Sequence, residues 1–187
     1  MNIYEIRDLA LKSGRAVYTA QQLANLINKP KSIATVYVQR LVRKGLAKKI
    51  VRGKISFSED DAVIAGQLVE PSYISFYSAL AFHRLVKQVP RNTECATTKR
   101  SIRYGSLGIV YHRIPPSLFY GYERHAKALG YVFVAEAEKA LVDSVYLNAI
   151  PRNLAKEISS GLDMAKLKGY IGRFKGRGRK KLERWLL

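Results

Sequence analysis

Amide, hydroxyl, methyl and cationic side chains recur between residues 32 and 44 at spacings that place them on one face of a helix. Gln can pair with adenine and Arg with guanine, and a Val methyl group can contact the methyl group of thymine. Lys and Arg also neutralise phosphates. These residue types indicate a face that reads base edges and binds the DNA backbone. The residues concerned are Ser32, Thr35, Val36, Gln39, Arg40, Arg43 and Lys44.

A helix over residues 32–44 must position these side chains, and the apolar residues predict it. Gly45 is placed at its C-terminal cap. A shorter helix, capped by Thr19, precedes it and ends at Pro30, because a proline disfavours helix at the residue before it. A first helix is expected over residues 2–13. The inward stripe of the helix over residues 32–44 has the spacing of a buried helix face and consists of Ala34, Val38, Leu41 and Val42.

Two short strands, over residues 46–51 and 54–57, predict a hairpin around Arg52-Gly53. Two helices, a short turn, a third helix and a basic hairpin follow one another in the order of a winged helix-turn-helix. Cations on the hairpin would lie along the DNA backbone or reach into the minor groove. They are Lys48, Lys49, Arg52 and Lys54.

Two other interpretations of this basic region stay open. A charged helix face can be solvated without any ligand, and winged helices also mediate protein contacts. However, residues 1–58 hold only two acidic residues, Glu5 and Asp8, both in the first helix. A neutral protein-contact surface has no reason to exclude acidic residues, so this absence favours DNA.

The positive charge is concentrated at both ends of the sequence. Among 187 residues there are 33 Lys and Arg against 14 Asp and Glu, so the formal net charge is +19. Residues 1–58 carry +10, residues 59–151 only +1, and residues 152–187 carry +8. A charge of this size indicates a polyanionic partner. Its division predicts a DNA-binding domain over residues 1–58 and a second domain over residues 59–187 whose final part, 152–187, is basic and helical.

The second domain is predicted to be of mixed α+β class, because its strands and helices do not alternate regularly. Helices are expected over 60–69, 74–85 and 136–148, and strands over 93–98, 107–114 and 131–135. No apolar stretch is long enough to cross a membrane, and the first residues lack the apolar core of a signal peptide. We therefore expect a soluble, cytoplasmic protein.

A basic cluster lies between two further helices, which are expected over residues 163–174 and 180–187. The cluster is either a second nucleic-acid contact, to DNA or to RNA, or a solvated loop between packed helices. Its residues are Arg173, Lys175, Arg177, Arg179, Lys180 and Lys181.

Three segments of the second domain resemble the AbiEi family of abortive-infection antitoxins. They are Pro71–Leu80, the stretch that contains Ile114-Pro115-Pro116, Phe119 and Gly121-Tyr122-Glu123, and Ala135–Leu147, in which Glu-Lys-Ala-Leu is followed by Asp and then Tyr-Leu. The resemblance covers most of the chain, including the N-terminal winged helix. It implies an antitoxin of a phage-defence system that represses its own operon at inverted repeats in double-stranded DNA. It also implies a functional link to a co-encoded toxin of the nucleotidyltransferase type.

Glu136, Lys139 and Asp143 lie at i, i+3 and i+7, on one polar face of the helix expected over residues 136–148. A nuclease needs carboxylates that converge from several elements to hold Mg²⁺, which one helix cannot supply. Acidic residues in the first turn and an ion pair at i, i+4 are the simpler explanation of the three.

No other grouping of residues predicts catalysis. His83, His112 and His125 share no metal-ligand spacing, and Cys95 has no paired base. A Walker-type phosphate loop is also absent. We therefore expect no enzymatic activity, no catalytic residue, no metal and no cofactor. The alternative to a DNA-binding repressor is a basic RNA-binding or ribosome-associated protein, which the net charge suits equally well.

Overall fold

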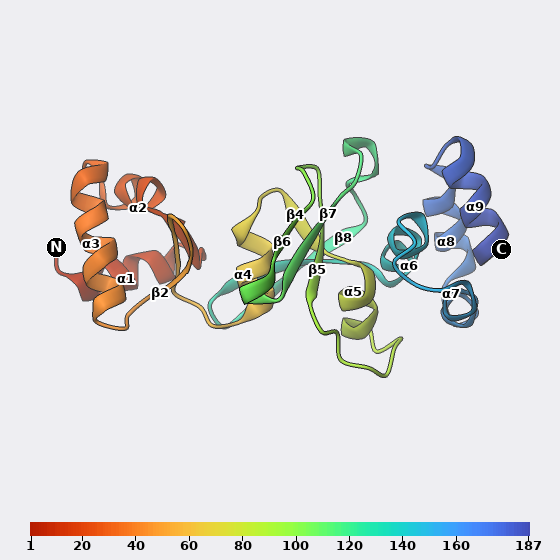
Figure 1. Ribbon diagram of the computed structural model, residues 1–187, viewed down its shortest axis with the longest axis horizontal. Helices are drawn as coiled ribbons and strands as arrows, with labels where there is room; N and C mark the ends of the chain where they lie inside the picture. The colour runs from red at the N-terminus through yellow and green to blue at the C-terminus, as the bar shows by residue number, and fades with distance from the viewer. The chain divides into compact units, whose positions relative to one another are not determined.

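The computed structural model describes residues 1–187 and has a mixed α+β fold, as the sequence predicts (Figure 1). The chain forms two compact units. The first comprises residues 1–70 and 125–132, and the second comprises residues 71–124 and 133–187. None of the helices combines the length and the apolar character needed to span a lipid bilayer.

Helices and a small antiparallel sheet make up the first unit. The three strands have the order β1-β3-β2, and the β2–β3 hairpin turns at Gly53, whose φ of +78° favours glycine. The elements are α1 (Ile3–Lys12), β1 (Val17–Thr19), α2 (Ala20–Ile27), α3 (Lys31–Arg43), β2 (Lys48–Val51), β3 (Lys54–Ser56) and α4 (Asp61–Leu68).

The core of the first unit lies between α1, α2, α3 and the sheet. Ala34 and Leu41 of the predicted inward stripe are fully buried, whereas Val38 and Val42 are half-buried against the same core. Three helices therefore form where periodicity and caps predict them. The buried cluster consists of Ile6, Ala10, Tyr18, Leu23, Ala24, Ile27, Ala34, Leu41, Ala47 and Ile55.

Thr19 caps α2 through a reciprocal pair of hydrogen bonds. Its Oγ1 accepts from the backbone N–H of Gln22 at 3.1 Å, and its own N–H donates to Gln22 Oε1 at 2.8 Å. Thr19→Ala is expected to lower the free energy of unfolding by about 1 kcal/mol, because an N–H of α2 loses its acceptor. Urea denaturation checks this, with Thr19→Ser as the control that keeps the hydroxyl. Equal stability of the Ala and Ser variants would contradict the prediction.

Residues 59–70 pack with the first unit, although the charge composition changes at residue 58. Gln67 Oε1 accepts hydrogen bonds from the backbone N–H groups of Ala16 and Val17, at 2.7 and 3.1 Å. This contact ties α4 to the start of β1. The first unit therefore includes residues 59–70 as well as the basic region 1–58. Its boundary follows hydrogen bonding and packing, not charge.

A six-stranded mixed sheet with the order β6-β7-β5-β4-β9-β8 forms the base of the second unit. Strand β4 pairs antiparallel with β5 and parallel with β9, and β5 pairs parallel with β7. Helix α6 contacts α5 and the C-terminal helices α7, α8 and α9 (Figure 1). The elements are β4 (Ser72–Ile74), α5 (Phe76–Phe82), β5 (Thr93–Thr97), β6 (Ile102–Tyr104), β7 (Ile109–Arg113), β8 (Tyr122–Lys127), β9 (Gly130–Ala135), α6 (Ala137–Tyr146), α7 (Arg152–Ser159), α8 (Met164–Gly172) and α9 (Gly176–Leu186).

The structure corrects the sequence prediction at the C-terminal helices. Helix α9 begins at Gly176, not at Lys180, so most of the basic cluster lies on the first turns of α9 and not in a loop. Arg and Lys are good helix formers. Gly178 suits this helix because a Cβ there would lie 2.9 Å from the ring of Tyr146. Helix α7 and the strands β1, β4, β6 and β8 were not predicted.

Candidate nucleic-acid interface

All seven residues that the sequence predicted on the outer face of α3 are exposed. The buried Ala34 and Leu41 lie on the opposite side of the helix, which turns the predicted face to solvent. Val36, the apolar member of this face, is 43% exposed. Two further residues of α3 are also exposed: Lys31, with which the helix begins, and Ile33.

A groove of about 410 Å³ runs between α3 and the β2–β3 hairpin. Thr35, Gln39 and Arg43, at i, i+4 and i+8, line its helix side, and Lys49 lines its hairpin side. Its floor is apolar and includes Val38, Val42, Ile55 and Tyr18. Five of the predicted residues, these four and Lys54, therefore line one groove between α3 and the hairpin. The remaining exposed ones lie on the solvent face outside it: Ser32, Val36, Arg40, Lys44, Lys48 and Arg52.

Lys54 is placed differently from the other hairpin cations. Its stem lines the groove, but its ammonium donates a hydrogen bond to the backbone carbonyl of Leu68 at the end of α4. Burial lowers the pKa of Lys54. Because β3 is the central strand of the sheet, Lys54 is partly covered and holds the hairpin against α4. Tyr18 is a groove residue that sequence reasoning missed, since β1 was not predicted.

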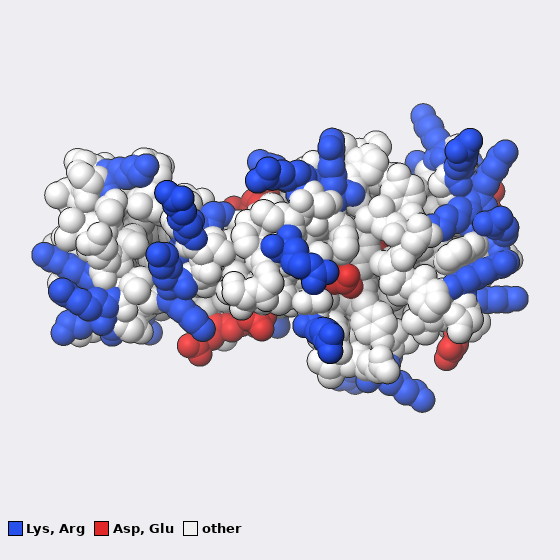
Figure 2. All heavy atoms as spheres, in the orientation of Figure 1, with Lys and Arg blue, Asp and Glu red and all other residues white.

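The electrostatic character of this surface is uniform. No acidic residue occurs between Asp8 and Glu59, a range that contains α2, α3 and the hairpin. The side chains that Figure 2 shows over α3 are accordingly uncharged or basic. No ion pair involves the exposed cations of α3, β2 or the turn at Arg52. They are available to an external anion.

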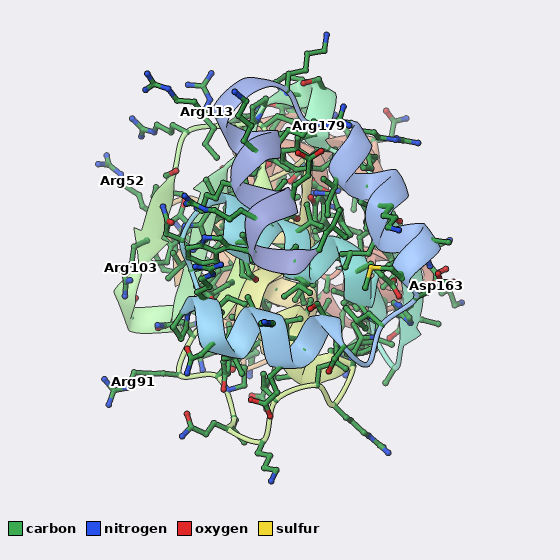
Figure 3. All side chains as sticks on the ribbon, turned by 90° about the vertical axis from the view of Figure 1, so that its right-hand side faces the viewer. Arg52, Arg91, Arg103, Arg113, Asp163 and Arg179 are labelled. Atoms are coloured by element: carbon green, nitrogen blue, oxygen red, sulfur yellow. The ribbon has the colours of Figure 1, made fainter.

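The second predicted cluster divides into two groups. Three of its residues have partners within the protein. The Arg173 guanidinium lies 4.2 Å from the ring centroid of Tyr120. Arg179 Nε donates a hydrogen bond to Glu183 Oε1 at 2.8 Å, and Lys181 Nζ donates one to Asn148 Oδ1 at 2.5 Å. The other three are exposed and form no ion pair: Lys175, Arg177 and Lys180. Figure 3 looks onto α7, α8 and α9, with Arg179 at one end of α9 and Asp163 just before α8.

The histidines and the cysteine have structural environments. His83 Nε2 lies 2.7 Å from the carbonyl oxygen of Ala135, and His112 Nε2 lies 3.2 Å from Glu94 Oε1. Cys95 is buried, which raises the pKa of its thiol. No group of three or more His, Cys, Asp and Glu side chains is arranged to hold a metal ion.

The geometry of α3 and the hairpin thus brings amide, hydroxyl and cationic groups to one surface. The second unit carries a separate basic surface on α9. Comparison of the sequence with protein-family models and with curated proteins finds no match.

Proposed function

We propose that α1, α2, α3 and the β2–β3 hairpin form a winged helix-turn-helix, and that the protein is a sequence-specific DNA-binding transcriptional repressor. The observation that carries the proposal is the groove between α3 and the hairpin. In this groove, Gln39 and Arg43 of α3, whose side chains can hydrogen-bond to bases, lie opposite Lys49 of the hairpin. The region between Asp8 and Glu59 contains no acidic residue. A solvated surface does not require this combination of amide, hydroxyl and cationic groups.

In the proposed complex, α3 enters the major groove, which is wide enough to admit a helix. Gln39 and Arg43 would hydrogen-bond to base edges, and Val36 would contact a thymine methyl group. Lys48, Lys49 and Arg52 of the hairpin would contact the flanking backbone. Lys54 is left out of this set, because its ammonium binds the carbonyl of Leu68.

The biological role follows from the resemblance to the AbiEi antitoxins. We propose that the protein represses its own operon at inverted repeats and counters a co-encoded nucleotidyltransferase-type toxin. The segments Pro71–Leu80 and Ala135–Leu147 support this role, whereas the surface of α3 supports DNA binding independently of any toxin.

A titration of the protein onto the DNA upstream of its own gene, beside a scrambled duplex, tests the proposal. The variant Arg40→Ala, Arg43→Ala is expected to bind the native duplex on the order of 100-fold more weakly, because Arg43 loses a guanine contact of about 1–3 kcal/mol and Arg40 loses a phosphate contact. A matched control, Arg7→Ala, Lys12→Ala, removes two cations from α1 and should retain most of the affinity. Gel-shift or fluorescence anisotropy titrations give the affinities of all three proteins for both duplexes.

Each outcome separates two functions. Tight binding to the native duplex that the α3 variant loses supports a repressor that reads bases through α3. Equal binding to native and scrambled duplexes contradicts sequence-specific repression and makes RNA the next ligand. Cleavage of either nucleic acid that depends on Mg²⁺ would support a nuclease instead.

A further inference from the structure

Three cations form one stripe along the solvent face of α9. Arg177, Lys180 and Arg184 are spaced three and four residues apart, which places them on one side of a helix. They lie opposite Leu182 and Leu186, which are buried against the rest of the second unit. All three side chains are exposed. Arg184 did not belong to the predicted cluster and joins it only through the geometry of α9.

No acidic side chain balances this stripe. Glu183, the one acidic residue of α9, forms its ion pair with Arg179 on another side of the helix. The first turn of α9 contains no acidic residue, and Lys175 at the N-cap provides no side-chain cap. Positive side chains near the N-terminus oppose the helix dipole and reduce helix stability. The helix dipole therefore disfavours Arg177, near the start of α9, and favours only Arg184, which lies in the last turn. The positive charge of the stripe (Figure 2, over α9) has no anionic partner within the protein, so it is available to an external anion.

The chemistry of the stripe favours a phosphate backbone over bases. It offers no amide, no hydroxyl and no exposed aromatic ring, which are the groups that read or stack on bases. The neighbouring aromatic residues are engaged elsewhere. Tyr146 and Phe174 pack on each other with ring centroids 5.0 Å apart, and the ammonium of Lys181 lies 5.1 Å from the Trp185 ring. Single strands, which bind through exposed aromatic rings, are therefore a poor fit.

We infer that the stripe Arg177, Lys180, Arg184 binds the phosphate backbone of duplex DNA without reading its sequence. This inference rests on the proposed function, because it takes duplex DNA to be the partner of the chain. Since both surfaces belong to one polypeptide, DNA held by α3 is presented to the stripe at a raised effective concentration. The stripe would thus add affinity, while α3 would supply specificity.

The full-length variant Arg177→Gln, Lys180→Gln, Arg184→Gln tests the inference. Affinities for the native and the scrambled duplex are measured between 50 and 200 mM salt. Loss of three phosphate contacts should reduce the slope of log K against log salt by roughly 2 to 3. Affinity near 0.1 M salt should fall on the order of 100-fold for both duplexes, and their ratio should not change.

A matched control removes the same charge from elsewhere in the second unit. Lys87→Gln, Arg91→Gln, Arg103→Gln neutralises three exposed cations away from α9, two of which are labelled in Figure 3. This variant should change the slope far less. A further variant, Arg177→Glu, places an acidic residue in the first turn of α9, so it should raise the melting temperature while weakening binding to both duplexes. A misfolded variant would bind more weakly but would also melt at a lower temperature, so the two measurements together distinguish misfolding from the loss of a DNA contact.

An unchanged slope in the α9 variant, or an equal loss in the control variant, would overturn the inference. A loss restricted to the native duplex would also overturn it, since it would indicate base reading. Failure of the proposed function has a different signature. If the α3 variant keeps the ratio between the duplexes while the α9 variant lowers the slope, then sequence-specific repression fails and the stripe stands.

Discussion

Replacement of Lys139 by methionine is expected to lower the free energy of unfolding by about 3–5 kcal/mol, because it leaves a buried carboxylate without its cation. The side chains of Lys139 and Asp143 are 0% and 1% exposed. Asp143 accepts hydrogen bonds from Tyr73 at 2.9 Å and Ser75 at 2.8 Å, and Lys139 donates to Asp143 and to Tyr73. The pair thus joins α6 to β4 and to the start of α5.

The double variant Lys139→Met, Asp143→Leu distinguishes the ion pair from mere packing. Removing both charges avoids an unpaired charge, so the double variant should recover much of the stability that the single variant loses. The hydroxyls of Tyr73 and Ser75 would then lack their acceptor, which keeps the recovery incomplete. Urea denaturation of both variants measures the difference. A single variant as stable as the wild type would show that Asp143 is not held as an anion.

The sequence predicted the partners of this ion pair but not its surroundings. An i, i+4 pair is readable from spacing, but spacing does not show whether the polar face of residues 136–148 is buried. Its burial depends on Tyr73 and Ser75, which lie far away in the sequence. Tyr73 belongs to β4, a strand too short to show periodicity, and Ser75 is the N-cap of α5. Contacts between side chains of one helix can therefore be predicted from their spacing. Contacts with elements that lie far away in the sequence, such as β4, cannot.

The same distinction applies to the basic surfaces. All seven residues predicted on the outer face of α3 are exposed, because the helix shows a clear apolar stripe and its ends are marked by Pro30 and Gly45. Lys54 was assigned to the DNA contacts because a hairpin pattern does not reveal which strand is central. The stripe on α9 was missed as a unit because the predicted start of the helix at Lys180 separated Arg177 from Arg184.

The affinity for duplex DNA should fall steeply as the salt concentration rises. The slope of log K against log salt is proportional to the number of phosphates that the protein contacts. Five exposed cations on α3 and the hairpin give a slope of about −4.5, hence about a 500-fold loss between 50 and 200 mM salt. Three more on α9 bring the slope to about −7 and the loss to about 10⁴-fold. The five are Arg40, Lys44, Lys48, Lys49 and Arg52.

A salt series of anisotropy titrations on native and scrambled duplexes measures this slope. Phosphate contacts are independent of sequence, so the scrambled duplex is the control and should show a steep slope as well. A wild-type loss of about 500-fold would assign binding to the first unit alone, and a loss of about 10⁴-fold would require the α9 stripe. A loss below about tenfold would correspond to no more than about two phosphates. Neither basic surface would then bind DNA, because each presents more cations than that.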